Sequence, residues 1–252
     1  MDDEITSPER GRTTRAEWAA VARFIARPRL PERTAPFSRR SLIALVRIYG
    51  LDLALMGLLA LIAGVVVSAG QELPETALAG MEITAGLALA VILGAPLAEE
   101  VIFRGWLSGR KRHFAALAAV IAGGVSADIL GASALPGRGI WLIGVVVLFA
   151  GLAGLLFWTG RNRTPMRWFS RAFPLFFWLS TIAFACIHLA NFAEGALWVL
   201  LPLVLPQFLL GVLLGYLRVH CGLWASIALH ALHNGTALGL VWIGLRFAGA
   251  EG

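Results

Sequence analysis

Three clusters of polar side chains interrupt long apolar stretches of this 252-residue sequence. They read Glu99-Glu100-Val-Ile-Phe-Arg104, Phe184-Ala-Cys-Ile-His188 and His230-Ala-Leu-His-Asn234. An ionisable side chain in the middle of an apolar helix costs roughly 2.5 to 3.5 kcal/mol on insertion scales. A chain that keeps several such residues has a use for them, so these clusters hold the candidates for chemistry.

The first cluster divides into a pair and a single carboxylate. Glu100 and Arg104 are four residues apart, so on a helix they share a face and can neutralise each other. Glu99 points about 100° away from Glu100 and has no partner within the segment. Because an unpaired carboxylate in a membrane is a functional hypothesis by default, we expect Glu99 to act in the chemistry and the pair to support it.

The histidines occupy the other two clusters. His230 and Asn234 are also four residues apart and can therefore point at one site inside a helical bundle. His233 either joins them or faces a neighbouring helix. Taken alone, His188 would be interpreted as a hydrogen-bonded packing residue, and only its combination with the other clusters makes it a candidate.

Together the clusters supply a carboxylate, two or three imidazoles and an amide. This set can activate water, with a carboxylate as base and imidazole and amide donors for the oxyanion that forms when a peptide carbonyl is attacked. It can also bind one zinc ion, because two histidines and a glutamate with an open position are a common catalytic set. The ligands would then be Glu99, His188 and His230. The sequence contains no His-Glu-x-x-His.

The elements that must position these residues are predicted to be membrane helices. Apolar residues make up 58% of the chain, charged residues only 14%, and the mean hydropathy is +0.78. Seven apolar runs are each about as long as the roughly 20 residues that cross a bilayer. They lie near 42–69, 83–107, 113–131, 140–159, 173–192, 196–217 and 222–246. We therefore predict an all-α, polytopic transmembrane bundle of about seven spans, with eight as the alternative count.

Loop charges predict how the bundle is oriented. Arginine-rich loops near 110–112 and 161–171 alternate with loops that carry glutamates, which by the positive-inside rule predicts a cytoplasmic amino terminus and a multi-pass protein of the cell (inner) membrane. This pattern explains the formal charge of +6 without a nucleic-acid partner. Charged residues near predicted span ends are explained by snorkelling to the interface; they are Arg47, Asp52 and Asp128.

The chain divides into two predicted regions. Residues 1–40, rich in arginine and proline, are expected to form a cytoplasmic tail, and residues 41–252 the transmembrane domain. Within the tail, apolar residues recur at helical spacing from 16 to 26 beside arginines, which indicates a short interfacial helix on anionic lipid. A solvated tail is the alternative.

The three clusters resemble the motifs of the CAAX protease and bacteriocin-processing (Abi) family of membrane proteases, Glu-Glu-x-x-x-Arg, Phe-x-x-x-His and His-x-x-x-Asn. Each motif is short, but all three occur in order on separate predicted spans, and the resemblance covers about residues 83–240. In the family the first two motifs usually lie closer together, so a segment near 113–160 is interpreted as an additional hairpin.

The resemblance implies an intramembrane endopeptidase whose substrate is a membrane-embedded or lipid-proximal peptide or protein. It implies that Glu99 and His188 activate water and that His230 and Asn234 hold the oxyanion. Glu100 and Arg104, with Phe184 of the second motif, would support the site. The family has been described both as metal-dependent and as a metal-free glutamate protease; we favour the metal-free mechanism, with one Zn²⁺ as the alternative.

Two other classes of function remain open from the residues alone. One is a proton-coupled transporter that uses Glu99 and the histidines as a relay, although such proteins more often show repeat symmetry and broken helices, which this sequence does not indicate. The other is a non-catalytic membrane partner, such as an immunity protein, that keeps the fold without hydrolysis.

Overall fold

The computed structural model describes residues 13–74, 76, 82–133, 135–159, 164–192 and 194–248. Within these ranges the chain is almost entirely helical, and the only strand-like pairing is a single bridge between Thr76 and Phe192. In chain order the helices are α1 (Thr14–Ala26), α2 (Arg39–Ser68), α3 (Ala85–Leu89), α4 (Ala95–Arg104), α5 (Lys111–Ala132), α6 (Arg138–Trp158), α7 (Arg167–Arg171), α8 (Phe173–Ile187), α9 (Leu197–Leu203), α10 (Leu205–His220) and α11 (Leu223–Ala248). The predicted all-α class is confirmed.

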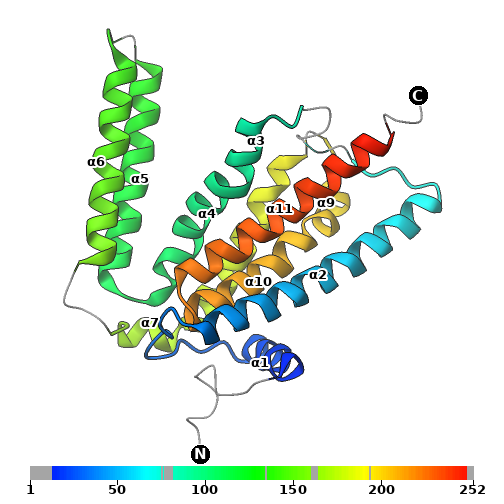
Figure 1. Ribbon diagram of the computed structural model, residues 1–252. Helices are drawn as coiled ribbons and strands as arrows, with labels where there is room; N and C mark the ends of the chain where they lie inside the picture. Colours follow the sequence, from blue (N-terminus) through cyan, green and yellow to red (C-terminus); the bar gives the residue numbers. More distant parts are fainter. Residues whose placement is uncertain are drawn as a thin grey trace, which may run out of the picture.

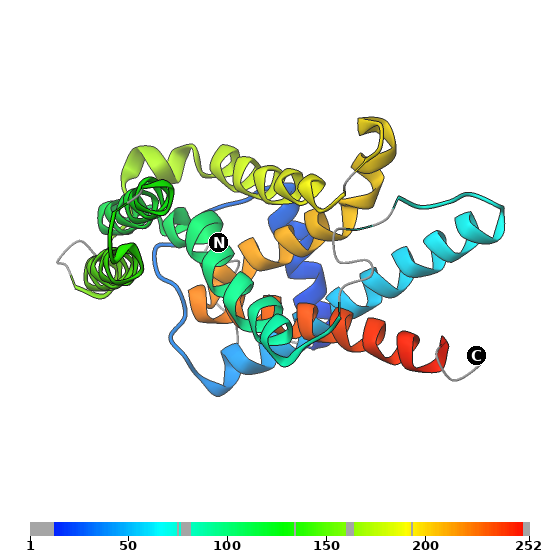
Figure 2. The same cartoon turned by 90° about the horizontal axis from the view of Figure 1, so that it is seen from above.

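The main bundle is built around α10, which α2, α8 and α11 contact (Figure 1). Every residue of α10 from Leu210 to Val219 is buried. Gly211 and Gly215 allow the close approach of α8, because a Cβ at Gly215 would lie 2.6 Å from the Phe177 ring. The view from above shows α4 lying near α11, on the side of the bundle that faces α5 and α6 (Figure 2).

The segment that carries the first motif is one long helix with two local changes of pitch. Its α3 and α4 portions are joined by a π-helical turn, Ala90–Gly94, and α4 is followed by a 3₁₀ turn, Gly105–Ser108. Single π-helical turns within α-helices occur frequently at functional sites. Arg218 of α10 donates to the carbonyls of Arg104 and Gly105, each at 2.7 Å, so it satisfies backbone acceptors where α4 ends.

Helices α5 and α6 form an antiparallel pair that stands apart from the bundle (Figure 1). They pack mainly on each other, through Ala116, Ala119 and Ala153. Their outer faces carry exposed apolar side chains such as Ile129 and Val147. Apolar faces of this kind are stable in lipid. The pair is formed by the residues near 113–160 that the sequence analysis interpreted as an additional hairpin.

Among the described residues, five helical segments are long and apolar enough to cross a membrane. They are Arg39–Ser68, Ala85–Ser108, Lys111–Ala132, Arg138–Phe157 and Phe173–Asn191, and α9 and α10 add a sixth if their pair, bent by 45°, is one span. The predicted seventh span, 222–246, corresponds to α11, which has 26 residues and packs on α2 and α10 but is not among these apolar segments. The protein is a multi-pass membrane protein, and the predicted number of about seven spans is approximate.

One end of the bundle carries α1 and α7 (Figure 1). Helix α1 contacts α2 and α10, burying Val21 and Phe24 in the core. Glu17 is also buried and accepts a hydrogen bond from the Tyr216 hydroxyl at 3.0 Å. The apolar face that was predicted to lie on lipid therefore packs on protein at Val21 and Phe24. Residues 1–12 of the predicted tail lie outside the described ranges.

Candidate active site

The Glu100–Arg104 pair lies at the centre of the buried polar network. The Glu100 Oε1 atom is 2.8 Å from the Arg104 Nη1 atom, and both side chains are fully buried. The Arg104 guanidinium also lies 3.7 Å from the centroid of the Phe184 ring. A cation over an aromatic face is attracted by its quadrupole, so Phe184 of the second motif holds α8 against the first motif.

Glu100 additionally connects α4 to α11. Its Oε1 atom is 3.0 Å from the His230 Nδ1 atom, and its Oε2 atom accepts a hydrogen bond from the Ser226 hydroxyl. Since a carboxylate only accepts, the Nδ1 of His230 is the donor, which directs the Nε2 atom of the ring the opposite way. Ser226 is a supporting residue that the sequence gave no reason to select, because an isolated serine in an apolar helix is an ordinary packing residue.

Glu99 lies on the other side of the His230 ring. Its Oε2 atom is 3.8 Å from the His230 Nε2 atom and 3.9 Å from the His188 Nε2 atom. That oxygen is buried and has no hydrogen-bond partner among the described residues, although the Glu99 side chain as a whole is 29% exposed. These separations exceed the length of a direct hydrogen bond. One water molecule, about 2.8 Å from each of its partners, can contact the carboxylate and an imidazole together.

His188 is oriented by its own helix. It begins the 3₁₀ turn that follows α8, and its Nδ1 atom is 2.6 Å from the carbonyl oxygen of Phe184. Because a carbonyl only accepts, Nδ1 carries a hydrogen and the Nε2 atom is directed towards Glu99. The Phe184 ring packs edge-on against both histidine rings, 4.7 Å from His188 and 5.6 Å from His230.

Asn234 follows His230 by one helical turn, but its amide is engaged elsewhere. The Nδ2 atom donates to the carbonyl oxygen of Val91 at 2.8 Å. Val91 belongs to the π-helical turn, where the changed pitch makes a carbonyl available to a neighbouring helix. One amide hydrogen of Asn234 therefore anchors α11 to the segment that carries Glu99, and the second remains.

His233 faces α2, which decides between the two orientations that the sequence left open. Its Nδ1 atom is 2.9 Å from the Asp52 Oδ2 atom, and Asp52 is fully buried. The interpretation of Asp52 as a snorkelling residue is therefore wrong. Asp52 lies well inside α2, and α11 covers the face on which it stands. The spacing within α2 could not show this contact, because the partner is 181 residues away.

Three of these side chains, Glu99, His188 and His230, are also a possible donor set for a metal ion. No group of three or more His, Cys, Asp or Glu side chains among the described residues is arranged to hold one. For Glu99, His188 and His230, the separations of 3.8 and 3.9 Å exceed the roughly 3.4 Å between donors in a tetrahedral zinc site and would open the angle at zinc to roughly 140°. Zinc binding would therefore require these side chains to approach one another by about 0.5 Å, and the zinc alternative stays a prediction.

The fold and the site define a polytopic helical membrane protein whose centre combines two carboxylates with two imidazoles. A family model described as type II CAAX prenyl endopeptidase Rce1-like matches residues 82–236, which is more than half of the chain. The chain belongs to this family, and the resemblance of its three motifs is confirmed. Comparisons with curated proteins and with solved structures gave no match. Family membership supports a CAAX-type intramembrane protease that acts on a membrane-associated substrate.

Proposed function

We propose that this protein is an intramembrane endopeptidase in which Glu99 activates the water that attacks a peptide carbonyl. The observation that carries the proposal is the Glu99 Oε2 atom, which has no hydrogen-bond partner among the described residues and faces the Nε2 atoms of two histidines at 3.8 and 3.9 Å. A base with a free oxygen, set one water molecule away from two imidazoles, suits general-base hydrolysis.

In the proposed first step, Glu99 removes a proton from water that His188 helps to hold. The resulting hydroxide attacks the carbonyl carbon and forms a tetrahedral oxyanion. The His230 Nδ1 atom already donates to Glu100, so His230 donates to the oxyanion through Nε2 when its ring is protonated.

The second step returns the proton. As the tetrahedral intermediate collapses, the carbon–nitrogen bond breaks and the protonated Glu99 delivers its proton to the leaving nitrogen. The products are a new carboxyl terminus and a new amine. The second Nδ2 hydrogen of Asn234 is available as a further oxyanion donor, because only the first is used by Val91.

The proposed setting is the cell membrane, with the amino terminus and the arginine-rich loops on the cytoplasmic side and a substrate held in or near the lipid. The proposed mechanism requires no metal, because Glu99 and the histidines act on the water directly. Each step uses only groups of this chain and water.

The test is proteolysis of a membrane-embedded or lipid-proximal peptide library by the purified full-length protein. Glu99→Ala and His188→Ala are expected to abolish cleavage. Glu72→Ala, a substitution of an exposed glutamate outside the helices, is the matched control and should cleave at the wild-type rate. Undiminished cleavage by either site variant would rule out the assignment. Proton flux in liposomes that depends on Glu99, without proteolysis, would favour a transporter instead.

A further inference from the structure

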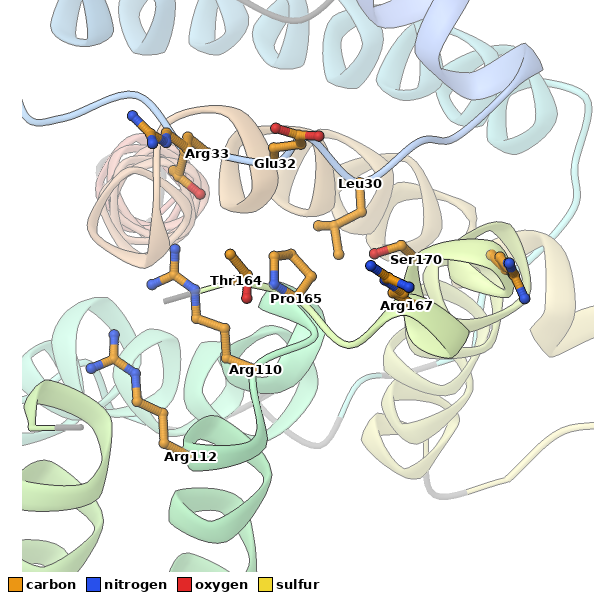
Figure 3. Close-up of a pocket in the computed structure, with 11 residues that line it drawn as sticks. Leu30, Glu32, Arg33, Arg110, Arg112, Thr164, Pro165, Arg167 and Ser170 are labelled. Atoms are coloured by element: carbon orange, nitrogen blue, oxygen red, sulfur yellow. The ribbon is translucent and has the colours of Figure 1, made fainter. Parts of the chain in front are cut away.

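A large basic cavity lies outside the candidate active site, at the end of the bundle that carries α7. Its volume is about 1270 Å³, and three separate parts of the chain line it: the segment between α1 and α2, the residues around the start of α5, and the residues leading into and forming α7 (Figure 3). Its charged lining consists of five arginines and one glutamate, namely Arg33, Arg110, Arg112, Arg167, Arg171 and Glu32. The cavity therefore has a strong positive charge.

The backbone that carries these arginines is tied to the bundle. The Ala35 amide donates to the carbonyl of His220 at 2.8 Å, which fixes the segment after Arg33. The Met166 amide donates to the carbonyl of Gly109 at 2.9 Å, which joins the residues before α7 to the start of α5. Gly109 has a φ of +67°, and a Cβ there would lie 2.5 Å from Phe169. Only glycine fits this junction, so the walls hold a defined position.

Membrane topology alone does not explain this arrangement. The positive-inside rule needs basic residues in loops near the membrane, but it does not need them to converge on one cavity. Arginines gathered from distant segments repel one another, and a bound anion offsets that repulsion. Guanidinium groups bind phosphate in a bidentate fashion, and basic pockets at the ends of membrane helices bind phospholipid head groups.

The shape of the site favours a phosphate with an apolar portion attached. Leu30 and Pro165 lie between Arg110 on one side and Arg167 on the other (Figure 3). A second cavity of about 570 Å³ shares Leu30, Ser170 and Arg171 with the first. It is lined by two further arginines, Arg27 and Arg29, and extends to Pro174 and Trp178 on the membrane helix α8.

We propose that the arginine cavity binds a phosphate group, carried by the head group of an anionic phospholipid whose acyl chains lie along α8. Free inorganic phosphate is the other source of the same chemistry. The proposal does not depend on proteolytic activity, because it concerns a separate cavity and is tested by binding.

The experiment measures binding of phosphatidylglycerol, phosphatidylcholine and inorganic phosphate to the full-length protein in neutral detergent, by native mass spectrometry and thermal shift. The test variant is Arg33→Gln/Arg167→Gln/Arg171→Gln, which alters three exposed arginines of the cavity. The control is Arg23→Gln/Arg39→Gln/Arg40→Gln, which removes the same charge from exposed positions of α1 and α2 outside both cavities.

Wild type should prefer phosphatidylglycerol to phosphatidylcholine by at least about tenfold, since one arginine near an anionic lipid contributes roughly fivefold in affinity. The cavity variant should lose at least about tenfold more affinity for phosphatidylglycerol than the control variant. Competition by inorganic phosphate at similar concentrations would assign the site to free phosphate. Equal losses in both variants, or no preference in wild type, would overturn the proposal, because diffuse attraction would then account for all binding.

Discussion

The Nδ1 atom of His230 lies 3.0 Å from the Oε1 atom of Glu100, across 130 residues of sequence. This contact makes the buried glutamate more than the counter-ion of Arg104. It fixes which nitrogen of His230 points towards Glu99, and it joins the first motif to the third. The two neighbouring glutamates thus lie on opposite sides of one imidazole: Glu100 orients the ring, and the Glu99 Oε2 atom has no hydrogen-bond partner among the described residues.

Replacing the two glutamates should separate stability from activity. Glu100→Gln removes the charge that pairs with Arg104 and His230, so it should cost about 3 to 5 kcal/mol of folding free energy, as expected when one partner of a buried ion pair is lost. Glu99→Gln removes no such partner and should change stability by less than about 1 kcal/mol. Denaturant or thermal unfolding in one detergent measures both, and equal stability of the two variants would contradict the division of roles.

Asn234 should contribute to the rate beyond its anchoring of α11. Asn234→Ala is expected to lower kcat about 10²-fold, the usual effect of losing one oxyanion donor. Thr236→Val is the control, since Thr236 lies on α11 like Asn234 and the substitution removes its hydrogen bond to Tyr49 of α2 without touching the site. Peptide cleavage and unfolding temperature are measured for both variants. If Asn234→Ala and Thr236→Val slow cleavage equally, Asn234 is only an anchor.

The His233–Asp52 pair should stabilise the packing of α11 on α2 without taking part in hydrolysis. His233→Leu leaves the buried Asp52 carboxylate without its partner and should destabilise the protein by about 2 to 4 kcal/mol. The double variant Asp52→Leu/His233→Leu should recover most of that loss, because removing both partners leaves no uncompensated charge. Unfolding curves of the single and double variants test this, and additive losses would show that the pair is not coupled.

Chelation should leave activity unchanged. If Glu99 activates water without a metal, dialysis against a strong chelator should alter the cleavage rate by less than about twofold, whereas loss of a catalytic ion would remove activity. A zinc endopeptidase treated in the same detergent serves as the positive control. Loss of cleavage that is restored by adding zinc would contradict the metal-free mechanism.

The sequence predicted the parts of the site that depend on position within one helix. The spacing of four residues placed Glu100 beside Arg104, and the isolation of Glu99 marked it as the free carboxylate. The apolar runs predicted most helix positions, because a bilayer requires a fixed length of apolar helix. These features are local and therefore visible in the order of residues.

What the sequence could not predict depends on contacts between helices. The bond from Glu100 to His230 requires α4 to lie against α11, and the Asn234 amide finds its partner only because the chain near Val91 is π-helical. Asp52 was misinterpreted for the same reason, since its burial is set by α11. The arrangement of the loops in space also changed the interpretation of the basic residues. The sequence explained them by membrane topology, whereas in the structure five arginines line one cavity.

The central claim is that water activated by Glu99 attacks the peptide carbonyl directly. The most direct measurement is a single turnover of a cleaved peptide in ¹⁸O-labelled water, followed by mass spectrometry of the product and of the protein peptide that contains Glu99. The account predicts ¹⁸O in the new carboxyl terminus of the product and none in the Glu99 side chain. Label in the Glu99 carboxylate after one turnover would contradict it, because Glu99 would then have attacked the substrate itself.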